Sequence, residues 1–436
     1  MRQYNVYILG LDDFNLRKLR GIPGAAECRF IGVLDSQEIL EADHFPVADM
    51  LRRAEQRMAG SGEPVDAVIG YVDFPVSTMI PVLAQRFGLR APSLTALLRC
   101  EHKYWSRLCQ REVVPDNIPR FEVFDPFEPD PLAGLSLDFP FWIKPIKSAG
   151  SFLGFRIDDA NAFHAAIEQI RAHIGIFAEP FNHILGLAEL PDEVARVDGH
   201  FCIAESIIGG RQCTLEGFVF DGAVHFHGVI DSIRARNAST FLRYQYPSRL
   251  PDRVIRRMEA ITERVLTHIG FDQSAFNVEF FWDRHADQVW LLEINTRIAQ
   301  HHSDLFEKVD GASNHAVVVD VALGREPRFA HGHGPHNFAA CCFLRHYSDG
   351  VVEDVPPPAE ITALQAEFPG FTYEPHVQPG TRLSALTHQD SYSYVLALIY
   401  LGGASPQRLR EAYRECRRRL RFHIRTLDRE GFICDG

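Results

Sequence analysis

The sequence predicts a protein of mixed α/β and α+β class that contains more than one domain. The chain has 436 residues, which is more than one hydrophobic core normally serves. Its first hundred residues alternate short apolar strands with amphipathic helical stretches, a pattern typical of a parallel sheet covered by helices. Later segments carry pairs of strands joined by polar turns, which indicate antiparallel hairpins.

The composition is ordinary for a soluble globular protein and excludes several classes of partner. Hydrophobic residues make up 46% of the chain and charged residues 23%, and no apolar run approaches the ~20 residues of a membrane span. A net charge of −12 argues against binding to nucleic acid or to an acidic membrane. Nine cysteines without a CxxC pair favour free thiols in a reducing compartment, so we expect a cytoplasmic protein.

The amino-terminal region predicts three strands of a parallel sheet, at residues 6–10, 30–35 and 67–72. No GxGxxG loop follows the first strand, so we expect no nucleotide site there. Residues 101–105 then open a helix that carries Lys103. A single lysine in a helix is most often a solvated charge, and only the later segments give it a role.

A strand, a loop and a return strand are predicted around Lys144. The apolar strand 139–145 contains this lysine, a Gly/Ser-containing loop covers 146–154, and a short strand follows at 155–157. Such a loop can surround phosphates with its N–H groups while the lysine adds a positive charge. No Walker A sequence is present, and an ordinary surface hairpin with a lysine explains this segment equally well by itself.

The segment 277–297 predicts a β-hairpin. Two runs rich in aromatic and branched residues alternate with period two on either side of a polar turn. If Trp282 lies opposite Trp290, the pairing also brings Glu279 opposite Glu293.

One face of this hairpin would carry a set of polar side chains. Glu293, Asn295 and Arg297 are spaced by two and therefore leave the same face of their strand. Glu279 can face the same way. Carboxylate and carboxamide oxygens suit Mg²⁺ that also holds substrate phosphates, and an arginine beside them stabilises charge on a transferred group. Alternating polar residues on a half-exposed hairpin are the equally simple explanation of this stretch alone.

The last hundred residues predict a further mixed region. A Pro/Gly/His-rich connector at 330–335 separates it from the preceding segments. Strands are expected at 338–344, 351–355 and 373–377, and two helices are expected to close the chain. The last helix begins at Ser405-Pro406, an N-cap residue followed by proline in the first turn.

In their order and spacing, these elements resemble the ATP-grasp superfamily, and within it the biotin-carboxylase-like branch. The resemblance covers nearly the whole chain and rests on several segments together. These are the helix with Lys103, the strand 141–145 with its loop, residues 204–207 (Ala-Glu-Ser-Ile), Asn277-Val278-Glu279 with Glu293-Ile294-Asn295-Thr296-Arg297, and Val377-Gln378-Pro379-Gly380 in the tail.

The resemblance implies a domain organisation. A Rossmann-like domain would occupy residues 1–105, a two-lobed ATP-grasp domain residues 106–328, and an α+β domain similar to the carboxy-terminal domain of biotin carboxylases residues 329–436. ATP would lie between the two lobes. Because biotin carboxylases are often dimers, the resemblance also suggests a homodimer.

It also implies roles for individual residues. Lys103 and Lys144 would contact the phosphates of ATP, together with Ser148 and Ser151 of the loop. Glu205 and Ile207 would lie at the adenine–ribose edge. Glu279, Glu293 and Asn295 would hold two Mg²⁺ ions, which Mn²⁺ could replace, and Arg297 would steady an acyl-phosphate or the attack on it.

The sequence departs from biotin carboxylases in ways that change the expected reaction. Those enzymes carry a glutamate after the Asn-Thr-Arg tripeptide that serves as base for bicarbonate, whereas this chain has His301 in its place. No biotinyl-lysine motif of the Met-Lys-Met kind is present. In addition, Ala204 stands where many relatives have a glutamate, which makes the nucleotide preference less certain.

We therefore expect an ADP-forming ligase that activates a small carboxylate, in the first instance an amino acid, as an acyl-phosphate for attack by an amine. His301 and His302 would border the acceptor site, where either one of them accepts a proton from the amine or both only shape the pocket. The alternatives are a carboxylase that uses bicarbonate and a non-catalytic ATP-binding protein.

Overall fold

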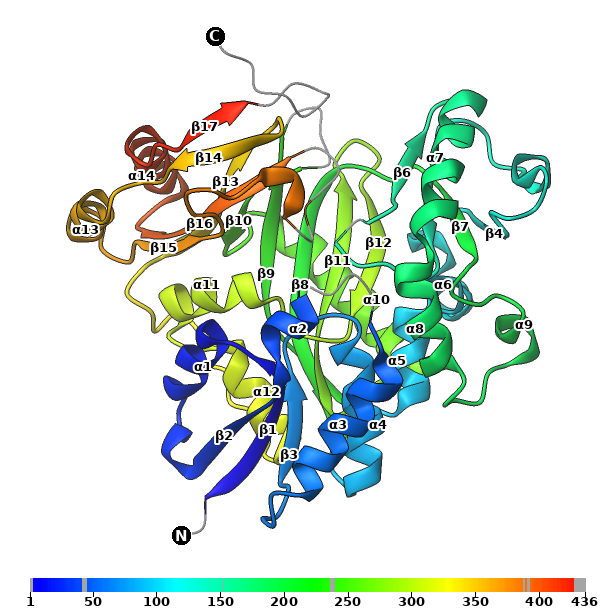
Figure 1. Ribbon diagram of the computed structural model, residues 1–436, viewed down its shortest axis with the longest axis horizontal. Coiled ribbons are helices and arrows are strands. Elements are labelled where there is room, and N and C mark those ends of the chain that lie inside the picture. The colour runs from blue at the N-terminus through cyan, green and yellow to red at the C-terminus, as the bar shows by residue number, and fades with distance from the viewer. Residues whose placement is uncertain are drawn as a thin grey trace. The chain divides into compact units, whose positions relative to one another are not determined.

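The computed structural model describes residues 3–40, 45–150, 152–235, 240–386, 389 and 393–426. It shows the mixed α/β architecture that the sequence predicts (Figure 1). The chain forms two compact units, each discontinuous in sequence: Met1–His227, Leu250–Ala299 and Asn314–Arg328 make up the first, and Gly228–Arg249, Gln300–Ser313 and Phe329–Gly436 the second. The three domain ranges expected from the sequence stay a prediction. Among the described residues, every helix is too short or too polar to cross a membrane.

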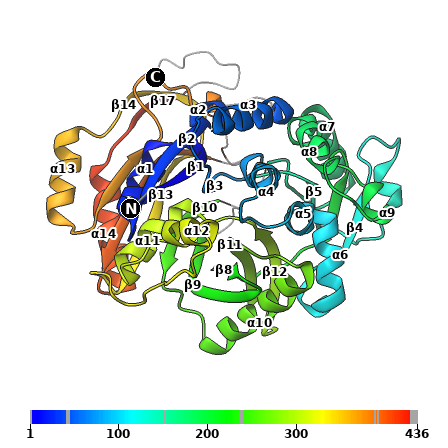
Figure 2. The ribbon, with the colours of Figure 1, turned by 90° about the horizontal axis from the view of Figure 1, so that it is seen from below.

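Three parallel strands open the first unit, as predicted. They are β1 (Tyr4–Leu11), β2 (Cys28–Asp35) and β3 (Ala67–Gly70), in the order β2-β1-β3. The central strand β1 is buried along most of its length because helices cover the sheet. Figure 2 shows α3 (Val47–Ala59) on one side of these strands and α12 (Asn314–Ala322) on the other. The remaining helices of this region are α1 (Asp13–Arg20), α2 (Ser36–Leu40), α4 (Val76–Phe87), α5 (Leu94–Glu101) and α6 (Lys103–Val113).

A four-stranded sheet follows in the chain, and its pairs are antiparallel. It has the order β4-β7-β5-β6, with β4 (Phe121–Phe124), β5 (Phe141–Pro145), β6 (Phe155–Ile157) and β7 (Cys202–Ser206). The predicted return strand is therefore confirmed. Helices α7 (Ala160–His173), α8 (Gly175–Leu185) and α9 (Asp192–Ala195) lie between β6 and β7 in the chain. Phe141 and Ile143 enter the core of this lobe, and Lys144, between Ile143 and Pro145 in the alternating pattern, faces away from it.

The strands of the second lobe have the order β12-β11-β8-β9. They are β8 (Arg211–Phe220), β9 (Ala223–Arg234), β11 (Ser274–Asp283) and β12 (Gln288–Asn295). Asp221 and Gly222 between β8 and β9 both have positive φ, of 48° and 80°, as a tight hairpin turn requires. Helix α10 (Asp252–Ile269) buries one apolar face, which carries Val254, Met258, Ile261, Val265 and Ile269 at helical spacing.

In the second unit, the strand order is β9-β10-β13-β16-β15, with β10 (Phe241–Tyr246), β13 (Phe338–His346), β15 (Thr372–Pro375) and β16 (Tyr394–Gly403). Strand β9 belongs to the first unit up to His227 and to the second from Gly228. A separate pair joins β14 (Gly350–Asp354) to β17 (His423–Thr426). The helices are α11 (Gln300–Asp310), α13 (Pro358–Glu367) and α14 (Pro406–Arg419). Short 3₁₀ turns along the whole chain cover Ala25–Glu27, Pro115–Asn117, Pro131–Gly134 and Leu383–Ala385.

The sequence predicted two helices at the end of the chain, and the prediction of the first of these helices is wrong. Residues 394–403 form the strand β16, which lies between β13 and β15 and is buried along most of its length. A continuous apolar run of this length fits a buried strand as well as a buried helix, and periodicity cannot separate the two. The last helix, α14, is confirmed, with Ser405 accepting a hydrogen bond from the N–H of Arg408.

Candidate active site

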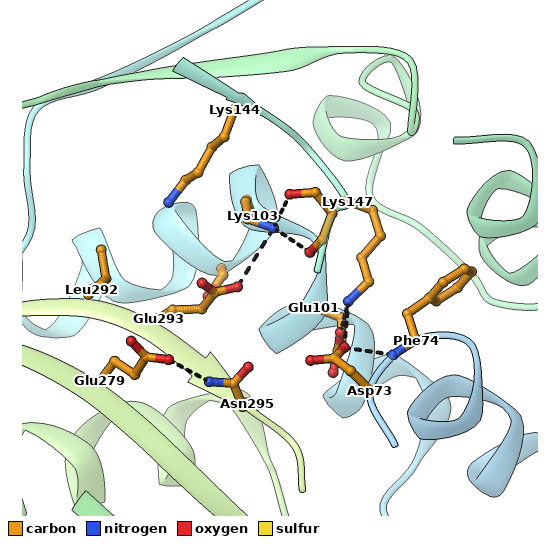
Figure 3. Close-up of polar contacts among 12 residues, drawn as sticks. Asp73, Phe74, Glu101, Lys103, Lys144, Lys147, Glu279, Leu292, Glu293 and Asn295 are labelled. Atoms are coloured by element: carbon orange, nitrogen blue, oxygen red, sulfur yellow. Dashed lines mark hydrogen bonds and ion pairs between the residues drawn. The ribbon is translucent and has the colours of Figure 1, made fainter. Parts of the chain in front are cut away.

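The hairpin β11–β12 brings the predicted polar residues onto one face (Figure 3). Glu279 lies opposite Glu293, and Asn277 lies opposite Asn295. The Asn295 Nδ2 atom donates to Asn277 Oδ1 at 2.9 Å and lies 3.4 Å from Glu279 Oε1. Gln212 Nε2 donates to the other Glu279 oxygen at 2.8 Å. These contacts turn the amide nitrogen of Asn295 toward its neighbours, so its oxygen, which lies 3.5 Å from Arg297 Nη2, is the atom that can bind a cation.

The register that produces this pairing differs from the one assumed. Trp282 lies opposite Val289, so the assumed pairing with Trp290 is wrong. A one-residue shift between Glu279 and Phe280 leaves Leu292 as the extra residue of a β-bulge, which restores the pairing of the two glutamates. The bulge also has a partner, because the carbonyl of Leu292 accepts a hydrogen bond from Arg107 Nη2 at 2.8 Å.

Lys103 is the first residue of α6, and its position is fixed by the residue before it. His102 caps the helix through Nδ1, which accepts from the Trp105 N–H at 3.2 Å, and its Nε2 lies 2.7 Å from the Val197 carbonyl. The Lys103 ammonium lies 3.6 Å from Glu293 Oε1 and donates to the Ser148 carbonyl at 3.3 Å (Figure 3). Burial lowers the pKa of Lys103, and Glu293 opposes this effect.

Lys144 belongs to a buried group of three charges. Its ammonium lies 2.9 Å from Glu205 Oε2, and Arg107 Nε lies 2.6 Å from Glu205 Oε1. Burial alone would raise the pKa of Glu205, but Arg107 and Lys144 outweigh it and lower the pKa to about 2. The Glu205 carboxylate is thus engaged within the protein, and its expected place at the adenine–ribose edge stays a prediction.

Three further residues were predicted to contact the nucleotide. Ile207 follows directly after β7 and is 40% exposed, which offers an apolar surface of the kind an adenine ring needs. Ser148 is buried in the loop after β5, where its hydroxyl lies 3.5 Å from the Lys103 ammonium. Ser151 lies outside the described residues.

The depressed pKa of Glu205 gives a test of this buried group. A carboxyl whose pKa is lowered on folding adds stability above its ordinary pKa of 4.5 and loses it as the pH falls toward 2. We expect Glu205→Gln to lower the free energy of unfolding by on the order of 3 kcal/mol at pH 7 and by clearly less at pH 3. Urea unfolding at both values measures the difference, and a penalty that is the same at both would contradict the account.

A second charged cluster contains residues that sequence reasoning missed. Lys147 pairs with Glu101, and its ammonium also lies 3.3 Å from Asp73 Oδ1. Arg297 donates to Asp73 Oδ2 from Nη2 at 2.6 Å and from Nε at 3.2 Å. Glu101 also accepts from the Thr296 hydroxyl at 2.7 Å. Two sequence signals could have found these residues. Lys147 belongs to the Gly/Ser-containing loop, and Asp73 follows β3 at the carboxyl edge of the parallel sheet, where functional residues of such sheets gather.

The charges in this cluster stabilise one another. Burial alone would raise the pKa of Asp73, but Lys147 and Arg297 outweigh it and hold the pKa well below its ordinary value. For Lys147, burial acts to lower the pKa, and Glu101 and Asp73 outweigh it in the other direction. For Glu293, burial alone would raise the pKa, but the nearby lysines outweigh it and lower the pKa. Asp73, Lys147 and Glu293 are therefore all ionised at neutral pH.

A comparison with protein-family models finds a match to the segment that carries Lys144, Lys147 and the hairpin β11–β12. A model described as an ATP-grasp domain matches residues 137–304. Residues 137–304 are an ATP-grasp domain. The matched range contains Lys144, the hairpin β11–β12 and His301. A search of curated proteins finds no match for this chain.

Solved structures show the same fold over almost the whole chain. An L-amino acid ligase from Bacillus licheniformis is 16% identical, with a TM-score of 0.76 over 98% of this chain and 100% of that chain. A carboxyaminoimidazole ribonucleotide synthase from Aspergillus clavatus complexed with ATP is 13% identical, with a TM-score of 0.66 over 96% and 99%. A biotin carboxylase from Campylobacter jejuni is 13% identical, with a TM-score of 0.64 over 96% and 92%. The ATP-grasp fold is therefore confirmed.

The last candidate residues of the ATP-grasp domain lie in the second compact unit. His301 is in α11, where its Nδ1 lies 3.5 Å from the hydroxyl of Tyr400 and its ring packs against Phe343. The Tyr400 hydroxyl donates to Glu374 at 3.1 Å. His302 is buried, and its ring packs edge-on against Tyr244. The roles of both histidines at an acceptor site stay predictions.

Proposed function

We propose that this protein is an ADP-forming ligase that joins a small carboxylate, in the first instance an amino acid, to an amine. The observation that carries the proposal is the face of β11–β12. It presents two carboxylates and a carboxamide oxygen beside the ammonium of Lys103, with Arg297 at the end of the same strand. This is the donor set that a phosphoryl-transfer site requires.

The reaction proceeds in two steps. An oxygen of the substrate carboxylate attacks the γ-phosphorus of ATP, and ADP leaves. The nitrogen of the amine then attacks the acyl carbon, inorganic phosphate leaves with the oxygen that came from the carboxylate, and the amine loses a proton. The first step needs positioning and charge neutralisation more than covalent help from the protein, because the carboxylate itself is the nucleophile.

The chain's own residues fit the parts of such a site. Within the described ranges, no three His, Cys, Asp or Glu side chains gather into a metal-binding group, so a Mg²⁺ site here needs Asn295 as its third protein ligand beside Glu279 and Glu293. Mg²⁺ bound there would neutralise negative charge on the phosphates. Lys103 and Lys144 would bind the phosphates as point charges. We expect two ions, and Mn²⁺ as a substitute.

The formal charges of the described site balance. The two charged clusters and the hairpin face together carry five positive and five negative side chains: Lys103, Arg107, Lys144, Lys147 and Arg297 against Asp73, Glu101, Glu205, Glu279 and Glu293. ATP with four negative charges and two Mg²⁺ ions is also neutral. Binding them together therefore leaves the site without excess buried charge, which supports the expectation of two ions.

The structural comparison supports amide formation. The L-amino acid ligase matches this chain over almost its whole length. In addition, the chain has a histidine, His301, where the resemblance to biotin carboxylases places their bicarbonate base. A carboxylase that uses bicarbonate is the alternative. The cytoplasmic location and the homodimer expected from the sequence stay predictions.

A pooled substrate screen tests the proposal. Purified protein receives MgATP and pools of the twenty common amino acids and simple amines, and release of ADP and phosphate is measured. We expect release that needs both a carboxylate and an amine. Release that needs bicarbonate and no amine would favour the carboxylase, and ATP binding without any release across all pools would contradict both.

A further inference from the structure

The side chain of Asp73 connects three segments that are far apart in the chain. Asp73 lies in the loop between β3 and α4, Lys147 lies in the loop after β5, and Arg297 lies two residues after the end of β12. One oxygen of Asp73 accepts from the Phe74 N–H at 2.6 Å and lies 3.3 Å from the Lys147 ammonium. The other oxygen accepts from Arg297 (Figure 3 shows Asp73 with Phe74 and Lys147).

These contacts orient the guanidinium of Arg297. Two of its three nitrogens, Nε and Nη2, donate to the same oxygen of Asp73. Within the part of the chain that the structure describes, the third nitrogen, Nη1, has a 3.4 Å contact with the carbonyl of Ile298, the next residue. A guanidinium is planar, so holding one edge fixes the direction of the whole group. Nη1 is then the atom from which Arg297 can donate to a reacting carboxylate or acyl-phosphate.

Lys147 is held in a comparable way. Its ammonium lies between the carboxylates of Asp73 and Glu101 and 5.5 Å from the centre of the Phe74 ring. Asp73 also separates this ammonium from Arg297. Without the carboxylate, a buried ammonium would face a partly buried guanidinium with no negative charge between them, which is costly in an environment of low dielectric.

We propose that Asp73 is a positioning residue of the ligase site, which holds Arg297 and Lys147 in place for the carboxylate substrate and its acyl-phosphate. This inference rests on the proposed function. Asp73 acts through Arg297 and Lys147, whereas the nucleotide phosphates are assigned to Lys103 and Lys144. Loss of Asp73 should therefore affect the chemical step and leave nucleotide affinity nearly unchanged.

Asp73→Asn tests this role because it keeps the shape of the side chain and removes its charge. We expect kcat to fall about 100-fold, since a misplacement of about 1 Å can cost this much, while KM for ATP stays within about threefold. Asp49→Asn is the matched control, because Asp49 pairs with Arg52 and Arg53 on the exposed side of α3. Unchanged kcat in Asp73→Asn, or a loss confined to KM for ATP, would overturn the proposal.

A second measurement works without any known substrate. Asp73→Ala opens a space the size of a carboxylate between Lys147 and Arg297, and formate has the charge and size to fill it. Formate should raise the melting temperature of Asp73→Ala by several degrees more than that of the wild type or of Asp73→Asn, whose side chain leaves no space. Formate should also raise the turnover of Asp73→Ala roughly tenfold and leave the turnover of the wild type and of Asp73→Asn unchanged.

The two measurements separate this inference from the proposed function. If no substrate supports turnover, the proposed function fails, and selective stabilisation by formate still decides whether Asp73 holds the two cations. Equal stabilisation of all three proteins would overturn the inference. If Asp73→Ala does not fold, as judged by circular dichroism, the kcat and KM values of Asp73→Asn decide it.

Discussion

Glu293→Gln is expected to lower ATP turnover by at least ~10²-fold, because it removes one of the two carboxylates that we propose as ligands of Mg²⁺. Glu293 lies opposite Glu279 in the hairpin and 3.6 Å from the Lys103 ammonium. The substitution keeps the size of the side chain but removes its charge. A Mg²⁺ ion then has one anionic protein ligand in place of two, and Lys103 loses its partner. Steady-state release of ADP measures the effect.

The matched control for this variant is Glu263→Gln. Glu263 is an exposed residue of α10, outside the charged clusters, so its substitution should leave turnover unchanged. Melting temperatures of both variants establish that each protein is folded. Turnover of Glu293→Gln within about threefold of the wild type would remove the hairpin face from the catalytic machinery. A loss that high Mg²⁺ fully reverses would limit its role to metal affinity.

Arg107→Leu is expected to lower the free energy of unfolding by about 3–5 kcal/mol, the usual cost of leaving one buried charge without its partner. The Arg107 side chain is only 4% exposed, pairs with Glu205 and donates to the carbonyls of Leu291 and Leu292. Its loss leaves the carboxylate with Lys144 alone and leaves the bulge of β12 without its donor. Urea unfolding at pH 7 measures the change.

A double-mutant cycle makes this second prediction specific. In Arg107→Leu with Glu205→Gln, the carboxylate that lacked its partner is gone, so the double variant should be more stable than the sum of the two single effects predicts. We expect a coupling of about 1–3 kcal/mol. Additive effects, or a loss below about 1 kcal/mol in Arg107→Leu, would show that this ion group contributes little to the fold.

The hairpin illustrates what sequence alone could predict. Period-two spacing correctly placed Glu293 and Asn295 on one face, because the alternation of side chains along a strand is a local property. The pairing of Glu279 with Glu293 was predicted from a wrong pairing of Trp282. It is nevertheless found in the structure, because the bulge at Leu292 shifts the register by one residue. A bulge leaves little trace in the sequence, since it depends on a partner elsewhere, here Arg107.

Asp73 shows where sequence reasoning ends. It lies 224 residues before Arg297, and neither residue carries a local signal that it pairs with the other. The same holds for Arg107, which is 98 residues from Glu205 and reads as one more charge on a helix. Lys103 and Lys144 could be predicted only because a family resemblance supplied their roles. Long-range ion pairs require the fold before they can be recognised.

The central claim is that a carboxylate becomes an acyl-phosphate, and the fate of a labelled oxygen tests it directly. Amino acids that carry ¹⁸O in their carboxylates are incubated with the protein, MgATP and an amine, and the released phosphate is analysed by mass spectrometry. The account predicts one ¹⁸O atom in each phosphate formed, because phosphate leaves with the carboxylate oxygen. Phosphate without ¹⁸O, formed at the same rate, would show that water or bicarbonate attacks ATP in place of the amino acid and would contradict the proposed ligase.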